Sequence, residues 1–195
     1  MTPPLNRRAL LVAAPAALVL AGGAAVLVPV ASPALLPWTL DPTDPRVSLE
    51  DVEREVIRRY PVPEIPVATL AAMLARGTVT LFDVRTQAEF DAGHLPGAVR
   101  VEPGTTAEAI LAQHRHRLDE GPVVFYCAVG VRSSQAMVAT LRKIAPLAGG
   151  GVYNLRGGIF RWTAEGHALA TQAGPGQPHP YDARWGRLLQ RIAAP

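Results

Sequence analysis

The single cysteine, Cys127, is the residue of this sequence whose surroundings best suit nucleophilic chemistry. It directly follows the apolar run 122–126, and a helical pattern begins six or seven residues later. The loop between them reads Ala128-Val129-Gly130-Val131-Arg132 and leads into Ser133. Consecutive backbone N–H groups in such a loop can converge on an anion. The following helix adds the positive end of its dipole, and Arg132 adds a full charge. All three favour the thiolate, which is the reactive form of cysteine.

Two interpretations of Cys127 are open at this point. A lone cysteine at the end of a strand is commonly a small buried hydrophobe. Gly130 and Arg132 favour the alternative, because a strand end rarely needs a charge in a glycine-bearing loop. We therefore predict that Cys127 is a catalytic nucleophile. The predicted substrate-binding residues are those of the loop that follows it: Ala128, Val129, Gly130, Val131, Arg132 and Ser133.

Short apolar runs alternate with helical patterns on both sides of this loop. Strands are predicted at residues 79–83, 99–101, 122–126 and 152–155, and helices at 86–93, 105–118, 133–145 and 159–165. Strand and helix in alternation predict an α/β fold with a mostly parallel sheet and helices on both faces. Ligands of such sheets bind beyond the carboxyl ends of the strands, where Cys127 is expected.

Asp83 ends the first predicted strand beside the expected pocket, and Arg85 follows two residues later. These residues either set the electrostatics of the pocket or join Glu89 in a hydrogen-bonded group that fixes the turn between strand and helix. We favour the second interpretation, in which Asp83 and Arg85 support the site.

Three ordered segments resemble the rhodanese-like domain family. Residues 83–98, DVRTQAEFDAGHLPGA, resemble its first signature, and residues 127–133, CAVGVRS, resemble its active-site loop. Residues 154–162, NLRGGIFRW, resemble its closing element, in which we expect Gly157 and Gly158 to permit close backbone approach at the pocket wall. The resemblance implies a three-layer fold with a five-stranded sheet, in a single domain over residues 65–170.

The resemblance also implies a sulfurtransferase that moves sulfane sulfur from thiosulfate or a persulfide donor to a thiophilic acceptor. Cys127 would carry the sulfur as a persulfide, and neither a metal nor an organic cofactor is required. The loop fits such a scheme of two nucleophilic steps. The alternative is a rhodanese-type module that binds a partner or carries sulfur at the membrane without turnover. A phosphatase is disfavoured, because related phosphatases use a C-x5-R cradle and Cys127 to Arg132 is C-x4-R.

The amino-terminal segment, residues 1–40, is expected to meet a membrane. Arg7 and Arg8 are followed by no charge until Asp41, and 22 of the 28 residues in 9–36 are apolar. Residues 9–28 have the length of a helix that crosses about 30 Å of hydrocarbon. We predict either an uncleaved transmembrane anchor or an export signal peptide, with a buried core helix as the remaining alternative. Both predictions place the domain on the extracytoplasmic, periplasmic side, with membrane contact through residues 9–36.

The charges of the chain argue against nucleic acid as a partner. The formal charge of +3 becomes +1 without residues 1–40, and the whole chain has one lysine, so no cationic stripe is present. The expected partners are instead a small sulfur-containing anion or a persulfide donor, and a thiol acceptor. A single cysteine also excludes an internal disulfide framework and a multi-cysteine zinc site.

Proline-rich stretches flank the predicted domain. Residues 41–64 are predicted to be a linker with a short helix that begins at Ser48. Residues 171–195 are predicted to be a tail with a short amphipathic helix, which either docks on the domain or contacts a membrane surface through Trp185, Leu188 and Leu189.

Overall fold

The computed structural model of this protein describes residues 17–21, 24–28, 38–119 and 121–193. The chain forms two compact units, Met1–Trp38 and Thr39–Pro195. In the first unit, β1 (Ala17–Ala21) pairs antiparallel with β2 (Ala24–Val28). These ten residues are therefore strands rather than parts of the expected helix.

The rest of the predicted membrane segment, residues 9–36, lies outside the described residues. Within the part of the chain that the structure describes, no helix is both long and apolar enough to cross a bilayer.

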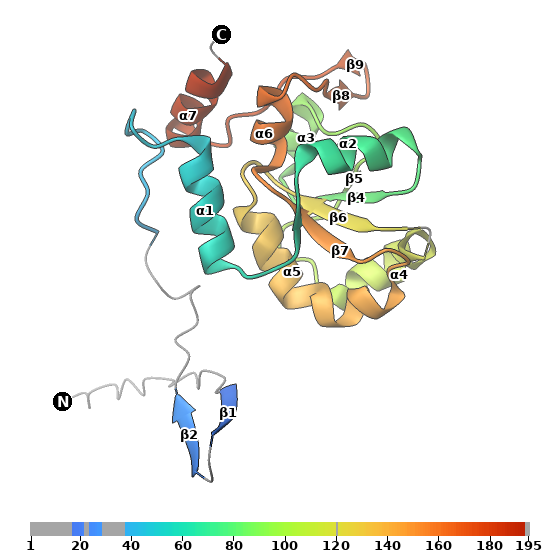
Figure 1. The fold of residues 1–195 in the computed structure, drawn as a ribbon. Helices are drawn as coiled ribbons and strands as arrows, with labels where there is room; N and C mark the ends of the chain where they lie inside the picture. Colours follow the sequence, from blue (N-terminus) through green and yellow to red (C-terminus); the bar gives the residue numbers. More distant parts are fainter. Residues whose placement is uncertain (1–16, 22–23, 29–37, 120, 194–195) are drawn as a thin grey trace, which may run out of the picture. The chain divides into compact units, whose positions relative to one another are not determined.

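The second unit contains the predicted α/β domain (Figure 1). Its five strands are β3 (Glu64–Ile65), β4 (Thr80–Asp83), β5 (Val99–Arg100), β6 (Val123–Tyr126) and β7 (Val152–Leu155). They are ordered β3-β7-β6-β4-β5, and every pair is parallel. The parallel sheet predicted from the alternating pattern is confirmed. The edge strand β3 escaped prediction because its two residues lie between Pro63 and Pro66, in the proline-rich stretch that marks the boundary of the predicted domain.

The helices cover both faces of this sheet, with α2, α3 and α6 on one side and α4 and α5 on the other (Figure 1). Their bounds are α1 Leu49–Arg59, α2 Val67–Ala75, α3 Gln87–Ala92, α4 Ala107–Leu118, α5 Val131–Ile144, α6 Gly158–Ala164 and α7 Ala183–Ala193. A 3-10 turn, Ala145–Leu147, follows α5, and a small hairpin joins β8 (Ala170–Thr171) to β9 (Gly174–Pro175).

The central strand β6 delivers Cys127 to the core. All four strand residues are buried, as expected of a strand with helices on both sides. Because side chains alternate across a strand, Cys127 lies on the same face as Val123 and Phe125. These three residues belong to one buried cluster with Met137 and Ile144 of α5. The catalytic candidate is therefore held by the packing between the sheet, α4 and α5.

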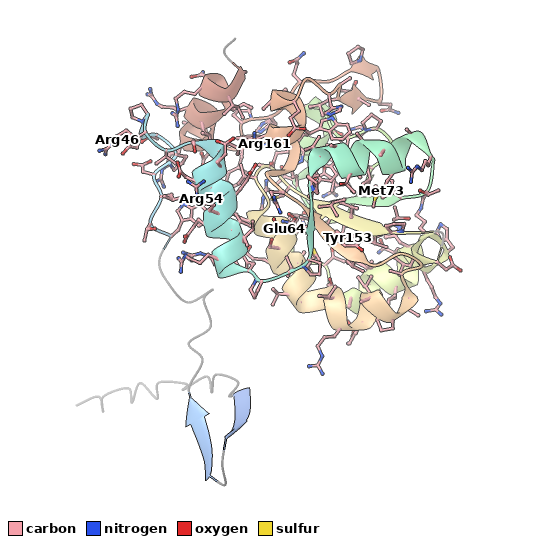
Figure 2. All side chains as sticks on the ribbon, viewed as in Figure 1. Arg46, Arg54, Glu64, Met73, Tyr153 and Arg161 are labelled. Carbon is pink, nitrogen blue, oxygen red and sulfur yellow. The ribbon has the colours of Figure 1, made fainter. Side chains whose placement is uncertain are left out.

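The flanking segments pack on this domain as part of the same unit. Figure 2 shows Arg161 of α6 beside α1, where its guanidinium pairs with Glu53 at 2.7 Å and with Glu50 at 2.5 Å. Arg191 of α7 donates to three backbone carbonyls in residues 42–47. Within the expected linker 41–64, α1 therefore docks on α6, and α7 of the expected tail 171–195 binds residues 42–47 of that linker.

Contact of Leu188 and Leu189 with a membrane surface is a wrong alternative, because both side chains are buried against the domain.

Candidate active site

The sulfur of Cys127 lies at the amino end of α5. The Gly130 N–H donates to Sγ at 3.2 Å, and the Ser133 hydroxyl donates to it at 3.5 Å. The first N–H groups of a helix have no acceptor within the helix, so this end carries partial positive charge. The cysteine is 1% exposed. The sulfur is thus buried, and one backbone donor and one hydroxyl donor face it.

Gly130 produces this geometry through its backbone. Its φ of +98° is a left-handed conformation, which starts α5 at Val131, two residues before the predicted start. A Cβ at Gly130 would lie 3.1 Å from the Asn154 side-chain nitrogen, which donates to the Gly130 carbonyl at 3.5 Å. A larger residue would therefore move the N–H that contacts the sulfur.

The first turn of α6 fixes the other side of the loop. The Ile159 N–H donates to the Cys127 carbonyl at 2.9 Å, and the Phe160 N–H donates to the Ala128 carbonyl at 3.1 Å. Gly158 makes this approach possible, since a Cβ there would lie 2.4 Å from the Cys127 carbonyl oxygen. The predicted close approach at Gly157-Gly158 is confirmed at Gly158.

Arg132 forms a two-pronged ion pair with Glu89. Its Nη1 and Nη2 lie 2.8 and 2.6 Å from the two carboxylate oxygens. Burial raises the pKa of Glu89, but the hydrogen bonds and charge of Arg132 outweigh it and hold that pKa below its ordinary value. The same carboxylate closes the capping box with Thr86 at the start of α3. Glu89 therefore ties the strand–helix turn after β4 to the cysteine loop.

Asp83 and Arg85 form a separate pair on the opposite face of the sheet. Both side chains are 0% exposed, and the Arg85 guanidinium donates to Asp83 through Nε at 2.9 Å and through Nη2 at 2.6 Å. Arg85 Nη2 also donates to the Gly93 carbonyl at 2.7 Å. The pair fixes the turn after β4. The expectation that Glu89 belongs to this group is wrong, because Glu89 points to Arg132 on the other loop.

Tyr181, from the tail, is the residue that sequence analysis missed. Its ring centroid lies 4.5 Å from Cζ of the Arg132 guanidinium, which is cation–π geometry. No local signal marks it, since it stands far from the cysteine motif and follows a proline-rich stretch.

A cavity of about 210 Å³ opens beside Arg132 on the α4/α5 side of the sheet. Its lining includes Val84, Val101 and Ile110, which belong to the same buried cluster as Cys127. Val84 and Val101 follow the carboxyl ends of β4 and β5, the edge where ligands of parallel sheets bind, and Ile110 belongs to α4. The described residues contain no group of three or more side chains arranged to hold a metal ion.

This arrangement supports nucleophilic chemistry at sulfur. A thiolate at Cys127 would be stabilised by the Gly130 N–H, the Ser133 hydroxyl and the amino end of α5. The loop that carries the Gly130 N–H is held through its carbonyls, which accept from the first turn of α6 and from Asn154.

The chain is similar in sequence to known proteins. The family model described as Rhodanese-like domain matches residues 66–165. The human thiosulfate:glutathione sulfurtransferase is 32% identical over 85 residues, which are 38% of this chain and 73% of that protein. A sulfurtransferase of Allochromatium vinosum is 32% identical over 114 residues, 58% of this chain and 99% of that protein. The structure of a Pseudomonas aeruginosa thiosulfate sulfurtransferase is similar with a TM-score of 0.49 at 22% identity, covering 78% of this chain and 26% of that one.

Proposed function

This chain belongs to the rhodanese-like domain family, and we propose that it transfers sulfane sulfur through a persulfide on Cys127. The names of its relatives support a sulfurtransferase role in general. The observation that carries the persulfide step is the Cys127 sulfur at the amino end of α5, with the Gly130 N–H at 3.2 Å. A step that leaves negative charge on sulfur requires hydrogen-bond donors fixed beside that sulfur.

The proposed reaction has two displacement steps. The Cys127 thiolate attacks the terminal sulfur of the donor, the donor's S–S bond breaks, and the leaving group departs with the electron pair. With thiosulfate the leaving group is sulfite, and Cys127 becomes a persulfide anion. A nucleophile such as a thiolate or cyanide then attacks the outer sulfur and regenerates the Cys127 thiolate. No external oxidant or reductant is needed. In each step the leaving group keeps both electrons of the broken S–S bond, and the attacking nucleophile supplies both electrons of the new bond to the transferred sulfur.

Mass spectrometry of the full-length chain tests this proposal. After treatment with thiosulfate or an organic persulfide, the peptide that contains Cys127 should gain the mass of one sulfur atom and lose it on addition of cyanide. The Cys127→Ser variant is the matched control and should gain nothing. If no sulfane donor modifies Cys127 in the folded protein, the proposal is wrong.

A second candidate function is sulfur carriage or partner binding without turnover. Its support is the burial of Cys127, which is 1% exposed, so that the sulfur is poorly accessible to a small substrate in solution. The two candidates differ in turnover: an enzyme regenerates free Cys127 many times with a small acceptor, whereas a carrier is loaded once and is discharged only by its protein partner. Steady-state release of thiocyanate from thiosulfate and cyanide distinguishes them.

We also propose that residues 9–36 direct the chain to a membrane and that Thr39–Pro195 acts on its extracytoplasmic side. The support is the apolar sequence after Arg7 and Arg8. A carboxy-terminal reporter that is active only in the cytoplasm should stay inactive, and its activity would contradict the proposal. Amino-terminal sequencing of the mature protein separates an anchor, with an intact start, from a signal cleaved near Ala34.

A further inference from the structure

The tail segment around Tyr181 is held across the rim of the active site from both sides. Before it, the Gln177 N–H donates to the Ala92 carbonyl at 2.9 Å, which attaches the tail to the end of α3. After it, the Asp182 carboxylate accepts from the N–H groups of Arg184 and Trp185, each at 2.9 Å, and so starts α7. Because α7 is itself docked through Leu188 and Arg191, the position of Tyr181 is determined by the fold.

Tyr181 has an unusual backbone conformation. Its φ of +68° is the left-handed region, and among the described residues it is the one non-glycine residue found there. A bulky residue persists in this conformation only where its surroundings require it, and such residues gather at ligand sites. Here the conformation brings the ring over Arg132 and leaves Tyr181 47% exposed. The exposed part of the ring is available to a ligand at the rim.

The consequence for Arg132 is that its charge is already engaged. Glu89 takes both terminal nitrogens, and the Tyr181 ring covers one face of the guanidinium. Arg132 is the one cationic side chain in the cysteine loop. A dianion such as thiosulfate therefore meets a neutralised cation and the electron-rich face of an aromatic ring, neither of which attracts it strongly.

Arg132 also lines the cavity of about 210 Å³. The lining is mostly apolar, with Val84, Val101 and Ile110 and with Ala136 and Ala139 from α5, and its polar members besides Arg132 are Glu102, Thr105 and Gln135. Arg132, Ala136 and Ala139 fall at helical spacing, so they share one face of α5. The volume is smaller than the usual range for drug-sized ligands and suits a compact carbon group. A ligand that reaches Arg132 thus has room for an apolar substituent in this cavity.

We infer that Tyr181 is a specificity-determining residue that favours an organic sulfane-sulfur donor, with one negative charge and an apolar group, over thiosulfate. This inference rests on the proposed function. The Cys127 thiolate attacks the terminal sulfur of the donor, the S–S bond breaks, and the organic leaving group departs with the electron pair. With an organic thiosulfonate the products are the Cys127 persulfide anion and the sulfinate, so atoms and charge balance.

Benzenethiosulfonate and thiosulfate form a suitable pair of donor probes, because one differs from the other in the replacement of a charged oxygen by an apolar ring. Cyanide serves as the acceptor for both, and the full-length chain is used in mild detergent. The readout is kcat/KM for benzenethiosulfonate divided by kcat/KM for thiosulfate. Comparing this donor ratio between variants cancels the intrinsic reactivity of each donor. Tyr181→Ala should lower this ratio about fivefold, mostly through a lower KM for thiosulfate, because the substitution uncovers one face of the Arg132 guanidinium. Tyr181→Phe keeps the ring and should match the unmodified chain.

The cavity is tested by a second variant. Ala139 is exposed at its margin, and Ala139→Leu preserves helix formation while filling part of the space. It should raise the KM for benzenethiosulfonate and leave that for thiosulfate unchanged. Val138→Leu is the matched control, because Val138 is 59% exposed on the adjacent position and does not line the cavity.

An unchanged donor ratio in Tyr181→Ala would overturn the role of Tyr181. An unchanged ratio in Ala139→Leu would overturn the placement of the organic group in the cavity. Neither result is confused with a failure of the proposed function, which would appear as an unmodified Cys127 in the parent chain with both donors.

Discussion

Two ion pairs near the carboxyl edge of the sheet, Asp83–Arg85 and Glu89–Arg132, differ in what surrounds them. Both join a carboxylate to a guanidinium, through three hydrogen bonds in the first pair and two in the second. The side chains of the first pair are 0% exposed, whereas in the second pair the exposure is 2% for Glu89 and 21% for Arg132. The first pair is local in sequence, and the second connects the first turns of α3 and α5. The same kind of ion pair thus stabilises the fold in one place and borders the reactive site in the other.

Burial explains this difference. A charge with no access to water depends wholly on its partner, so the Asp83–Arg85 pair tolerates no separate change of either member. A charge at the rim can be solvated when its partner is lost, so Arg132 can be released toward a ligand. Four predictions test this comparison.

The largest effect is expected from Asp83→Ala. It leaves the Arg85 guanidinium buried beneath the turn with only the Gly93 carbonyl, so the free energy of unfolding should fall by about 3–5 kcal/mol. Urea unfolding measures this change. A loss below about 1 kcal/mol would contradict the structural role of the pair.

Glu89→Gln should have a smaller effect on stability and a specific effect on the reaction. We expect a loss of about 1–2 kcal/mol, because Arg132 keeps access to water and Gln can still occupy the capping box. The freed guanidinium should accelerate modification of Cys127 by thiosulfate, and added salt should reduce this gain. Persulfide formation at low and high ionic strength is the measurement. A stability loss as large as that of Asp83→Ala would show that the two pairs do not differ in kind.

The pH dependence of stability should carry the signature of Glu89. Its pKa in the folded chain is below the ordinary value, so the unfolded chain binds more protons over that interval and stability rises with pH. The contribution is complete above the ordinary glutamate pKa and is lost as the pH falls through the lowered one. The difference in free energy of unfolding between the parent chain and Glu89→Gln should therefore shrink on acidification. A difference that stays constant with pH would contradict the ionised pair.

The smallest effect is expected from an exposed pair. Lys143 of α5 pairs with Glu108 of α4, and both side chains are more than half exposed. Lys143→Ala should change the free energy of unfolding by less than about 0.5 kcal/mol. Thermal or urea unfolding of this variant measures the loss in free energy of unfolding for an exposed pair, with which the losses at the other two pairs are compared.

Much of the fold was predictable because its signals are local. The capping boxes at Ser48 and Thr86 and the apolar run of β6 each depend on residues within a few positions of one another. The start of α5 was predicted two residues late, because the left-handed conformation of Gly130 begins the helix earlier than its periodic pattern suggests. The edge strand β3 and helix α2 escaped prediction, the first because it lies in the proline-rich stretch between Pro63 and Pro66 and the second because its apolar residues form no clear stripe.

The candidate site was predictable where one segment supplies it. The sequence by itself determined the cysteine, the glycine-bearing loop that turns its N–H groups inward, and the α/β order that places this loop at a strand's carboxyl end. Only the tertiary structure decided that Glu89 pairs with Arg132 instead of Arg85, and that Tyr181 covers the guanidinium. These contacts join segments that are remote in the chain. Periodicity and capping describe neighbours along the backbone, whereas the partner of a charge at the sheet edge depends on strand order and on the path of the tail.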